Sequence, residues 1–479
     1  MTPVARLRSL ALSQYAAAVE DLLVRAQSLS GDPDLAFIDI DDIAGSLVRF
    51  CRDGRASSLD QLALISGFSA VTGWCGLPFK ETDYRELMAA ARAAIRDHIA
   101  PDFHKDPPPR EGRRHHLIFC TDLNGPLHSP SLGAVDYARA VADGDPDAAI
   151  TFLLAPYGVH PATQAYAWKE FAKLRHMPRF EDFNRQETVE AIFSRGDDLI
   201  THVWCANALD PRITELAMIS PTVMFTCADF PPFQYADVYW HQQGEDYVRA
   251  LWRRCGVPEL FTENYVGGAP CTLSGETQAF ERRTKQDFGF SEDRLILATV
   301  GNRLAVDMGQ DFLAGMLQLV VSDPRIVWLI IGPLDQPTLD LLGAVAGPQI
   351  FHVPFEPNLV TLLTMTDIFV NPFRKGGGGS ALSAMRAGSI VLTRTDMGDV
   401  CALAPPEHGA SSAASFFERL RALTQSPALR AAFLERQNAR VAALTNQALL
   451  SRSIIDNVAL ARQRFDRRRG SGLNLLPDL

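Results

Sequence analysis

Short apolar runs alternate with helical patterns along most of the chain. Continuous apolar runs of about four to eight residues are typical of strands buried on both faces of a parallel sheet. Two sets of runs follow each other, the first at 116–120, 149–154, 199–205 and 222–227, the second at 295–300, 326–331, 349–353, 368–371 and 389–393. Helical patterns fall between them, near 161–176, 184–195, 208–219, 309–322, 335–346, 358–366 and 380–387. The sequence therefore predicts an α/β protein with two doubly wound domains in tandem.

The two ends of the chain carry helical patterns without strands. Apolar residues recur at helical spacing through the first 100 residues, and the prolines of 107–109 follow. A long helical pattern near 446–468 ends in a cluster of arginines, for which a solvated helix face is the main interpretation and a phosphate or membrane contact the alternative. The predicted parts are an all-helical domain at 1–100, a linker at 101–114, Rossmann-like domains at 115–270 and 271–445, a C-terminal helix at 446–469 and a tail at 470–479.

One glycine-rich stretch stands out inside the second set of strands. The apolar run 368–370 leads through a proline-containing turn into Gly376, Gly377, Gly378 and Gly379. Ser380 is the expected N-cap of the helix that follows, and Gly388 is expected to end that helix. A strand, a glycine loop and a helix start, in this order, suit a diphosphate, because the backbone can approach the ligand and the helix presents unpaired N–H groups. A flexible linker is the alternative, but the apolar run 389–393 resumes at once and places the loop inside a domain.

Composition and charge limit the classes of function. The formal net charge of −10 argues against non-specific binding of nucleic acid. No signal peptide and no apolar run long enough to span a bilayer are found, so no stable membrane insertion is expected. The eight cysteines are scattered without a CxxC pair, which favours buried thiols over a metal site or a disulfide framework. These properties predict a cytoplasmic protein.

The segment from about 198 to 400 resembles nucleotide-sugar glycosyltransferases of the GT-B fold. The matching stretches, in the order expected for that fold, are Asp198–Val203, Thr222–Asp229, Arg254–Pro258, Tyr265–Gly268, Val300–Leu304 and the glycine loop. The resemblance implies that the first Rossmann-like domain holds the acceptor, that the second holds the sugar nucleotide, and that the ligands meet in a cleft between them. A UDP-sugar is then the expected donor, and no further cofactor is expected.

Within the fold, Val370–Phe373 and the glycine loop look most like the cytoplasmic N-glycosyltransferases that modify bacterial adhesins, which are relatives of the O-GlcNAc transferases. These enzymes also have an all-helical N-terminal domain. The resemblance implies inverting, metal-independent transfer of a hexose or N-acetylhexosamine to a protein side chain. The competing resemblance is to retaining enzymes with a Glu-x7-Glu signature, whose two positions here hold Lys375 and Ser383, so neither acid is present. A retaining enzyme acting on a glycan or a lipid-linked acceptor remains the alternative.

Two departures from both groups concern the nucleotide. Ser383 stands where an acid usually holds the ribose, and Met308 stands where a lysine usually binds phosphate. Arg303 and Lys375 could supply that missing positive charge, since arginine suits phosphate through bidentate hydrogen bonds. The donor site is therefore expected to use Arg303, Lys375 and the N–H groups of the glycine loop up to Ser380 for the diphosphate. His352, Val353, Phe355 and Ser383 are expected at the nucleoside, and a surface ion pair for Arg303 and strand-end packing for His352 are the alternatives.

The acceptor side depends on residues that follow strands of the first set. His128 is the leading candidate for the base because its pKa lies near working pH, and Asp229 is the second. Asn124 and His202 are candidates for positioning the acceptor, and for His128, Asp229 and His202 a satisfied structural role is the alternative. No DxD-type pair flanks the phosphate site, so no metal is expected.

Three functions therefore remain open for this sequence. A transferase that moves a sugar from a UDP-sugar to a protein or glycan acceptor is favoured. A GT-B sugar-nucleotide 2-epimerase would leave the N-terminal helices unexplained. A non-catalytic partner that retains the fold is suggested by the missing acids at Lys375 and Ser383.

Overall fold

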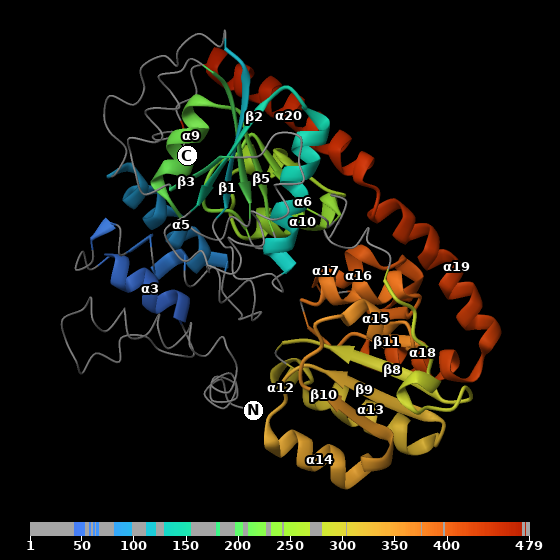
Figure 1. Ribbon diagram of the computed structural model, residues 1–479. Helices are drawn as coiled ribbons and strands as arrows, with labels where there is room; N and C mark the ends of the chain where they lie inside the picture. The colour runs from blue at the N-terminus through green and yellow to red at the C-terminus, as the bar shows by residue number, and fades with distance from the viewer. Residues whose placement is uncertain are drawn as a thin grey trace. The chain divides into compact units, whose positions relative to one another are not determined.

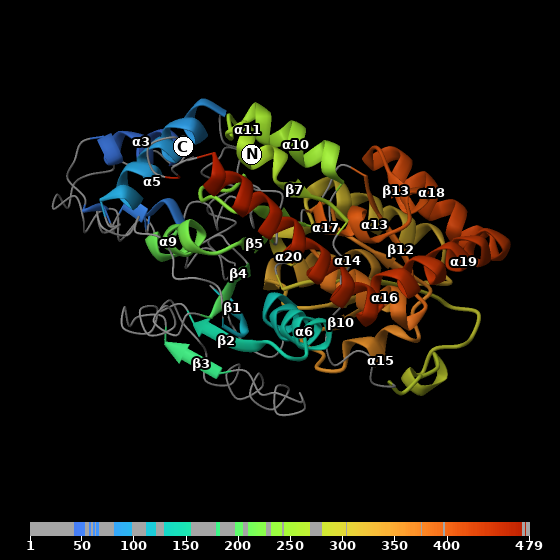
Figure 2. The ribbon, with the colours of Figure 1, turned by 90° about the horizontal axis from the view of Figure 1, so that it is seen from above.

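The computed structural model describes residues 43–52, 57–58, 61–62, 64–66, 81–97, 112–120, 129–154, 179–182, 197–204, 209–226, 231–241, 244–268, 280–302, 304–374, 376–395, 398–471 and 475. They fall into two compact units. The first unit holds the described residues up to 268 and those from 446 onward, and the second holds 280–445. Each unit contains one parallel sheet with helices packed on it (Figures 1 and 2).

The sheet of the first unit has seven parallel strands in the order β3-β2-β1-β4-β5-β6-β7. Their bounds are β1 Arg114–Cys120, β2 Ala149–Leu154, β3 Arg179–Asp182, β4 Asp198–Trp204, β5 Thr222–Phe225, β6 Val238–Trp240 and β7 Tyr265–Val266. The four predicted strands of the first set are confirmed as β1, β2, β4 and β5. The short strands β3, β6 and β7 are additional.

Two separate cores cover the two faces of this sheet, because side chains alternate along each strand. Ile118 and Ile200 point to one face, where they pack against α6 (Ser129–Gly144) and α20 (Gln447–Gly470). Leu117 and Val203 point to the other face, which is covered by α3 (Ile43–Arg52), α5 (Glu81–Arg96), α9 (Pro211–Ile219), α10 (Glu245–Arg254) and α11 (Glu259–Glu263). Both faces are thus buried, which explains the continuous apolar runs.

The described N-terminal helices belong to the first unit. Leu47 of α3 and Leu87 of α5 lie in the same hydrophobic core as Phe119 of β1. The hydroxyl group of Tyr84 donates to the carbonyl groups of Pro231 and Pro232, at 2.7 and 3.0 Å. In the structure these helices are therefore packed onto the sheet, whereas the sequence predicts them as a domain of their own.

The C-terminal helix α20 returns to the first sheet and is fixed there by arginines (Figure 1). Arg462 pairs with Asp198 at the start of β4, and Arg464 donates to the carbonyl groups of Asp237 and Asn264. Arg468 is buried, donates to the carbonyl of Ala217 and pairs with Asp237 at 3.4 Å. The interpretation of this arginine cluster as a solvated face is therefore wrong for these three side chains. Each of these side chains reaches an acceptor on another element of the first unit.

The sheet of the second unit has six parallel strands in the order β10-β9-β8-β11-β12-β13. Their bounds are β8 Leu295–Val300, β9 Ile326–Ile331, β10 Ile350–Val353, β11 Ile368–Val370, β12 Ile390–Arg394 and β13 Gly409–Ala410. The helices are α12 Leu304–Asp307, α13 Gln310–Ser322, α14 Gln336–Ala346, α15 Leu359–Leu363, α16 Gly378–Ala387, α17 Gly398–Leu403, α18 Ala413–Gln425 and α19 Pro427–Leu444. Trp328 and Phe312 are fully buried in its core. All five predicted strands of the second set are confirmed.

Within the described part of the chain, no helix combines the length and the apolar character that crossing a membrane requires. Cys51, Cys120 and Cys255 are buried thiols and Cys401 is half-buried, as expected for the described cysteines.

Candidate functional site

Three glycines meet at the carboxyl edge of the second sheet. Gly301 follows β8, Gly332 follows β9, and Gly377 follows β11 across a short turn. Gly332 has φ of +132°, and a Cβ atom there would lie 1.8 Å from the carbonyl oxygen of Gly301. A Cβ atom at Gly377 would lie 2.6 Å from Nη2 of Arg374. Only glycine permits these approaches, of Gly332 to the backbone of Gly301 and of Gly377 to the side chain of Arg374.

The glycine loop starts α16 earlier than the sequence predicts. The N-cap residue is Gly377, in a left-handed conformation with φ of 110° and ψ of 3°, and the helix begins at Gly378. The expectation that Ser380 is the N-cap is therefore wrong: Ser380 lies in the first turn. Gly388 ends the helix with φ of 93°, as expected.

The start of α16 offers unpaired backbone donors. A glycine N-cap has no side chain to bind the first N–H groups, and the first turn contains no acidic residue. The N–H groups of Gly378, Gly379 and Ser380 carry the partial positive charge of the helix N-terminus. Gly378 is buried against Asp399, whose Cβ atom would lie 3.0 Å from a Cβ atom at position 378. The arrangement suits a diphosphate at this end of the helix.

A buried arginine lies beneath the glycine loop. Nε of Arg374 donates to Oδ1 of Asn371 at 3.1 Å, and Nη2 donates to the carbonyl of Val300 at 2.6 Å. Nη1 pairs with Asp307 at 2.9 Å, with both side chains less than a tenth exposed. Arg374 was not singled out from the sequence, although its place between a buried strand and the glycines was a usable signal.

The predicted nucleoside residues lie at the same edge. Nε2 of His352 is 2.8 Å from the carbonyl oxygen of Gly332, and the N–H of Gly332 donates to the carbonyl of Val353 at 2.9 Å. Phe355 follows the edge strand β10 with 61% of its surface exposed. Ser383 is buried within α16. The structure therefore brings His352, Val353 and the glycine loop to one edge of one sheet.

Met308 is one of the positions at which this edge departs from the resemblance. Met308 is 5% exposed and belongs to the hydrophobic core around Phe312. A lysine at this position would have to leave the core to reach a ligand. Arg303 and Lys375, the predicted substitutes, lie outside the described residues, as do Asn124, His128 and Asp229.

His202, predicted on the acceptor side, lies in the interior of the first unit at 1% exposure. Its Nδ1 atom is 2.7 Å from the hydroxyl of Tyr137, and its Nε2 atom is 2.8 Å from Nδ1 of His116. Nε2 of His116 lies 3.2 Å from Asp145. Tyr137 and His116 therefore occupy both ring nitrogens of His202 inside the domain.

Burial governs the pKa values in this chain of polar groups. Burial, and then the charge of His116, lowers the pKa of His202 well below its usual value. Burial also raises the pKa of Tyr137. For Asp145, burial acts to raise the pKa, but the hydrogen bond from His116 and the charges of His116, Arg114 and Arg462 outweigh it and lower the pKa. The chain of polar groups therefore favours a neutral His202.

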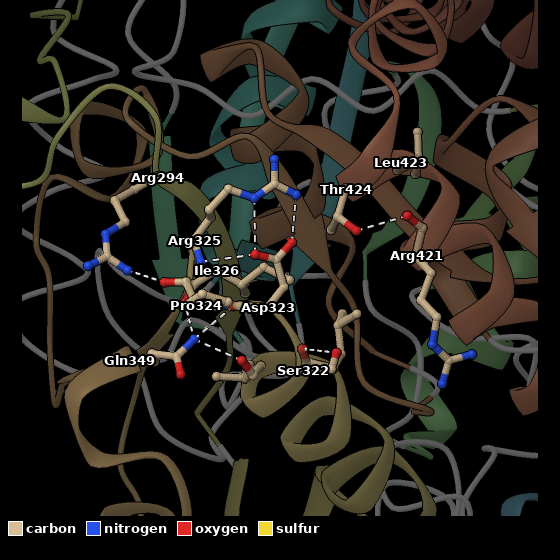
Figure 3. A network of polar contacts seen from close by, with 12 residues as sticks. Arg294, Ser322, Asp323, Pro324, Arg325, Ile326, Gln349, Arg421, Leu423 and Thr424 are labelled. Carbon is tan, nitrogen blue, oxygen red and sulfur yellow. Dashed lines mark hydrogen bonds and ion pairs between the residues drawn. The ribbon is translucent and has the colours of Figure 1, made fainter.

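The amino-terminal edge of the second sheet holds a cavity of about 260 Å³, lined by groups that include Lys285, Arg294, Arg325, Asp367 and Arg430. Figure 3 shows two of its arginines, of which Arg325 is bonded to Asp323 and Arg294 to the carbonyl group of Pro324. Arg325 makes two bonds to Asp323, at 3.0 and 2.7 Å, and Lys285 pairs with Asp367 at 2.9 Å. It lies at the edge opposite to the glycine loop, because Arg325 and Asp367 precede β9 and β11. The glycine loop therefore remains the candidate site.

Among the residues with a described position, no group of three or more His, Cys, Asp or Glu side chains is arranged to hold a metal ion. A metal-independent reaction stays a prediction.

The sequence matches no protein-family model and no curated protein. A mutant of the O-GlcNAc transferase of Thermobaculum terrenum is similar in structure, with a TM-score of 0.61 at 15% sequence identity over 95% of this chain and 99% of the other. The UDP-GlcNAc 2-epimerase of Neisseria meningitidis, bound to UDP-GlcNAc, has a TM-score of 0.47 at 10% identity, over 72% of this chain and 99% of the other. The trehalose 6-phosphate synthase of Burkholderia multivorans has a TM-score of 0.46 at 15% identity, over 73% and 99%.

Only the first of these TM-scores exceeds 0.5, so the fold assignment depends on that similarity. Together with the two parallel sheets, it establishes that the chain has the GT-B fold. At this level of identity the similarity defines the fold alone.

Proposed function

We propose that the chain is a glycosyltransferase that moves a sugar from a UDP-sugar to an acceptor, which is a protein side chain. The observation that carries the proposal is the uncapped start of α16 at the glycine-lined carboxyl edge of the second sheet. Ligands of open α/β sheets bind outside the carboxyl ends of the strands, and diphosphates bind at helix N-termini. The similarity in fold to a protein named as an O-GlcNAc transferase supports the same class of reaction.

The donor is bound in two parts in this proposal. The N–H groups from Gly377 to Ser380 hold the diphosphate, with Arg303 and Lys375 adding positive charge. The exposed ring of Phe355 stacks on the nucleobase, and the outer backbone groups of the edge strand β10 bond to it. Ser383 takes the place of the usual acid near the ribose.

The transfer itself is proposed to be inverting and independent of metal. The acceptor atom forms a bond to the anomeric carbon while the bond from that carbon to the diphosphate oxygen breaks, and the electron pair leaves with UDP. Backbone N–H groups and arginine stabilise the charge that develops on the leaving diphosphate. His128 takes the proton of the acceptor, with Asp229 as the second candidate, and Asn124 positions the acceptor.

A donor screen tests the proposal. The protein is incubated with individual UDP-sugars, with and without cell lysate as acceptor, and released UDP is measured. Release that requires both one UDP-sugar and the acceptor supports a transferase. Conversion of the UDP-sugar without any acceptor indicates an epimerase and contradicts the proposal.

A non-catalytic partner with the same fold is the second candidate. It is favoured by one observation: Met308, at the position where the resemblance expects a phosphate-binding lysine, is part of the hydrophobic core. Calorimetric titration with UDP separates the two candidates. Absence of binding at about millimolar UDP, a concentration that detects even about −4 kcal/mol of binding, favours the non-catalytic partner.

A further inference from the structure

Arg374 connects three segments at the carboxyl edge of the second sheet. Its guanidinium group donates to the carbonyl of Val300 at the end of β8, to Asn371 just after β11, and to Asp307 at the end of α12. Its side chain is 6% exposed. The planar guanidinium group fixes the angles between its hydrogen bonds, so it holds these segments in one geometry.

The glycines of the site are fitted to this guanidinium group. A Cβ atom at Gly301 would lie 2.2 Å from Nη1 of Arg374, and one at Gly377 would lie 2.6 Å from Nη2. The guanidinium group is therefore packed between the loop after β8 and the glycine loop that starts α16. Gly377 is the N-cap of α16, and its positive φ sets the direction of the first turn of the helix. A movement of Arg374 would remove the packing that holds Gly377 in this conformation.

Stability alone does not account for this arrangement. For a buried ion pair such as Arg374–Asp307, the free energy lost when the two charges leave water is about as large as the free energy gained from their attraction. Apolar residues of similar size at these two positions can therefore give a protein of equal stability. The Nδ2 group of Asn371 is buried and has no hydrogen-bond partner among the residues that the structure places. Leaving a buried donor unpaired is costly. Because Oδ1 of Asn371 accepts from Arg374, the orientation of this amide is fixed by the arginine.

We infer that Arg374 is a positioning residue of the donor site, which holds the glycine loop and the start of α16 in the geometry that binds a nucleoside diphosphate. The inference depends on the function proposed above. Arg374 acts through the backbone of Gly377 and through Asn371. Asp307 holds the guanidinium group in place by accepting a hydrogen bond from its Nη1 atom.

The chain offers a matched control for the test. Arg468 and Asp237 form a second buried ion pair in the first unit, with side chains 5% and 0% exposed, close to the 6% and 7% of Arg374 and Asp307. Arg374→Met and Arg468→Met each remove the arginine from one buried ion pair. Both variants are therefore expected to melt at a lower temperature.

The experiment measures UDP affinity by calorimetry at a temperature where each variant is folded. Arg374→Met is expected to bind UDP about tenfold more weakly or worse, since a small misplacement of binding groups is enough. Arg374→Lys is expected to lie between this variant and the wild type, because it keeps the charge and loses the planar fork. Arg468→Met is expected to bind as the wild type does. Equal losses of affinity in Arg374→Met and Arg468→Met would overturn the inference.

A second variant keeps the test valid if Arg374→Met does not fold. Arg374→Met combined with Asp307→Leu removes both charges of this ion pair, so neither member stays buried without the other. It is expected to melt near the wild-type temperature, to bind UDP about tenfold more weakly, and to show faster amide hydrogen exchange in peptides that cover 376–387. Wild-type affinity and wild-type exchange in this folded variant would refute the role of Arg374.

The hydrogen-exchange measurement needs no nucleotide, so the two proposals can fail separately. A wild-type protein that binds no UDP overturns the proposed function and the donor-site role together. Unchanged exchange at 376–387 in the double variant overturns the positioning role alone.

Discussion

Replacing Gly377 by alanine should weaken UDP binding without unfolding the protein. The residue has φ of 110°, where a side chain is strained by about 1–3 kcal/mol. The new Cβ atom would also lie 2.6 Å from Nη2 of Arg374 and 2.7 Å from Oδ1 of Asn371. Ordinary contacts of carbon atoms are about 3.5–4.0 Å, so the loop must move by roughly half an ångström or more.

A shift of that size moves the first N–H groups of α16 out of hydrogen-bonding distance of a bound phosphate. The expected loss of UDP affinity in Gly377→Ala is about tenfold or more, equivalent to at least about 1.4 kcal/mol. Calorimetric titration with UDP measures it, and thermal melting reports the strain separately.

Gly388→Ala is the matched control, at the other end of the same helix. Gly388 also has a positive φ, of 93°, but a Cβ atom there would meet no atom within 4 Å. Both variants should lose stability through backbone strain, Gly377→Ala more because of its close contacts, and only Gly377→Ala should lose UDP affinity. The reasoning is refuted if Gly377→Ala binds UDP as the wild type does, or if Gly388→Ala loses as much affinity.

Three further predictions concern the nucleoside, acid stability and metal. Phe355→Ala should weaken UDP binding by about 1–3 kcal/mol if the ring stacks on the base, as titration will show, and leave the melting temperature unchanged because the ring is 61% exposed. The pKa of His202 is lower in the folded state than in the unfolded state. Its contribution to the free energy of unfolding is therefore complete above about pH 6.5 and is lost as the pH falls. His202→Gln, which keeps one acceptor and one donor, should therefore flatten the fall in the free energy of unfolding between about pH 7 and pH 5, by up to about 2 kcal/mol; an identical slope would show that His202 does not titrate on unfolding. Sugar transfer, measured as UDP release, should be unaffected by EDTA, and loss of activity that Mg²⁺ or Mn²⁺ restores would contradict the metal-independent reaction.

Five of the six strands of the second sheet could be predicted from the sequence to within one residue, and β13 could not. The central strands of this sheet are buried on both faces, so 295–300 and 326–331 are uninterrupted apolar runs. The strands β6 and β7 could not be predicted in this way. They have three and two residues and are defined by their pairing with neighbouring strands, a property that no local pattern carries.

The place of the candidate site in the fold could be predicted from the sequence, but the start of its helix could not. Glycines between a strand and a helix are a local signal, and the structure places them at the carboxyl edge of the second sheet, where the proposed ligand would bind. The start of α16 was misplaced because serine is the usual N-cap, whereas here the close approach of Arg374 and Asn371 requires a glycine at the cap. The burial of Arg374 could not be predicted locally, because its partners are distant in the chain. Asp307 lies 67 residues before it and Val300 lies 74 residues before it.

The contacts of the arginines in α20 could not be predicted from the sequence either, because they also join residues that are distant in the chain. Arg464 and Arg468 differ in no local property from the exposed arginines beside them. The acceptors of Arg464 are carbonyl groups just before β6 and β7, and the acceptor of Arg468 is a carbonyl group of α9. The separations are 200 residues for Arg464 to Asn264 and 251 for Arg468 to Ala217, so only the folded chain identifies these acceptors.

A crystal structure of the protein with UDP tests the central claim most directly. The account predicts the diphosphate at the start of α16, with its oxygen atoms about 2.7–3.2 Å from the backbone nitrogen atoms of Gly378, Gly379 and Ser380. UDP bound at any other place, with these N–H groups turned away from it, would contradict the account.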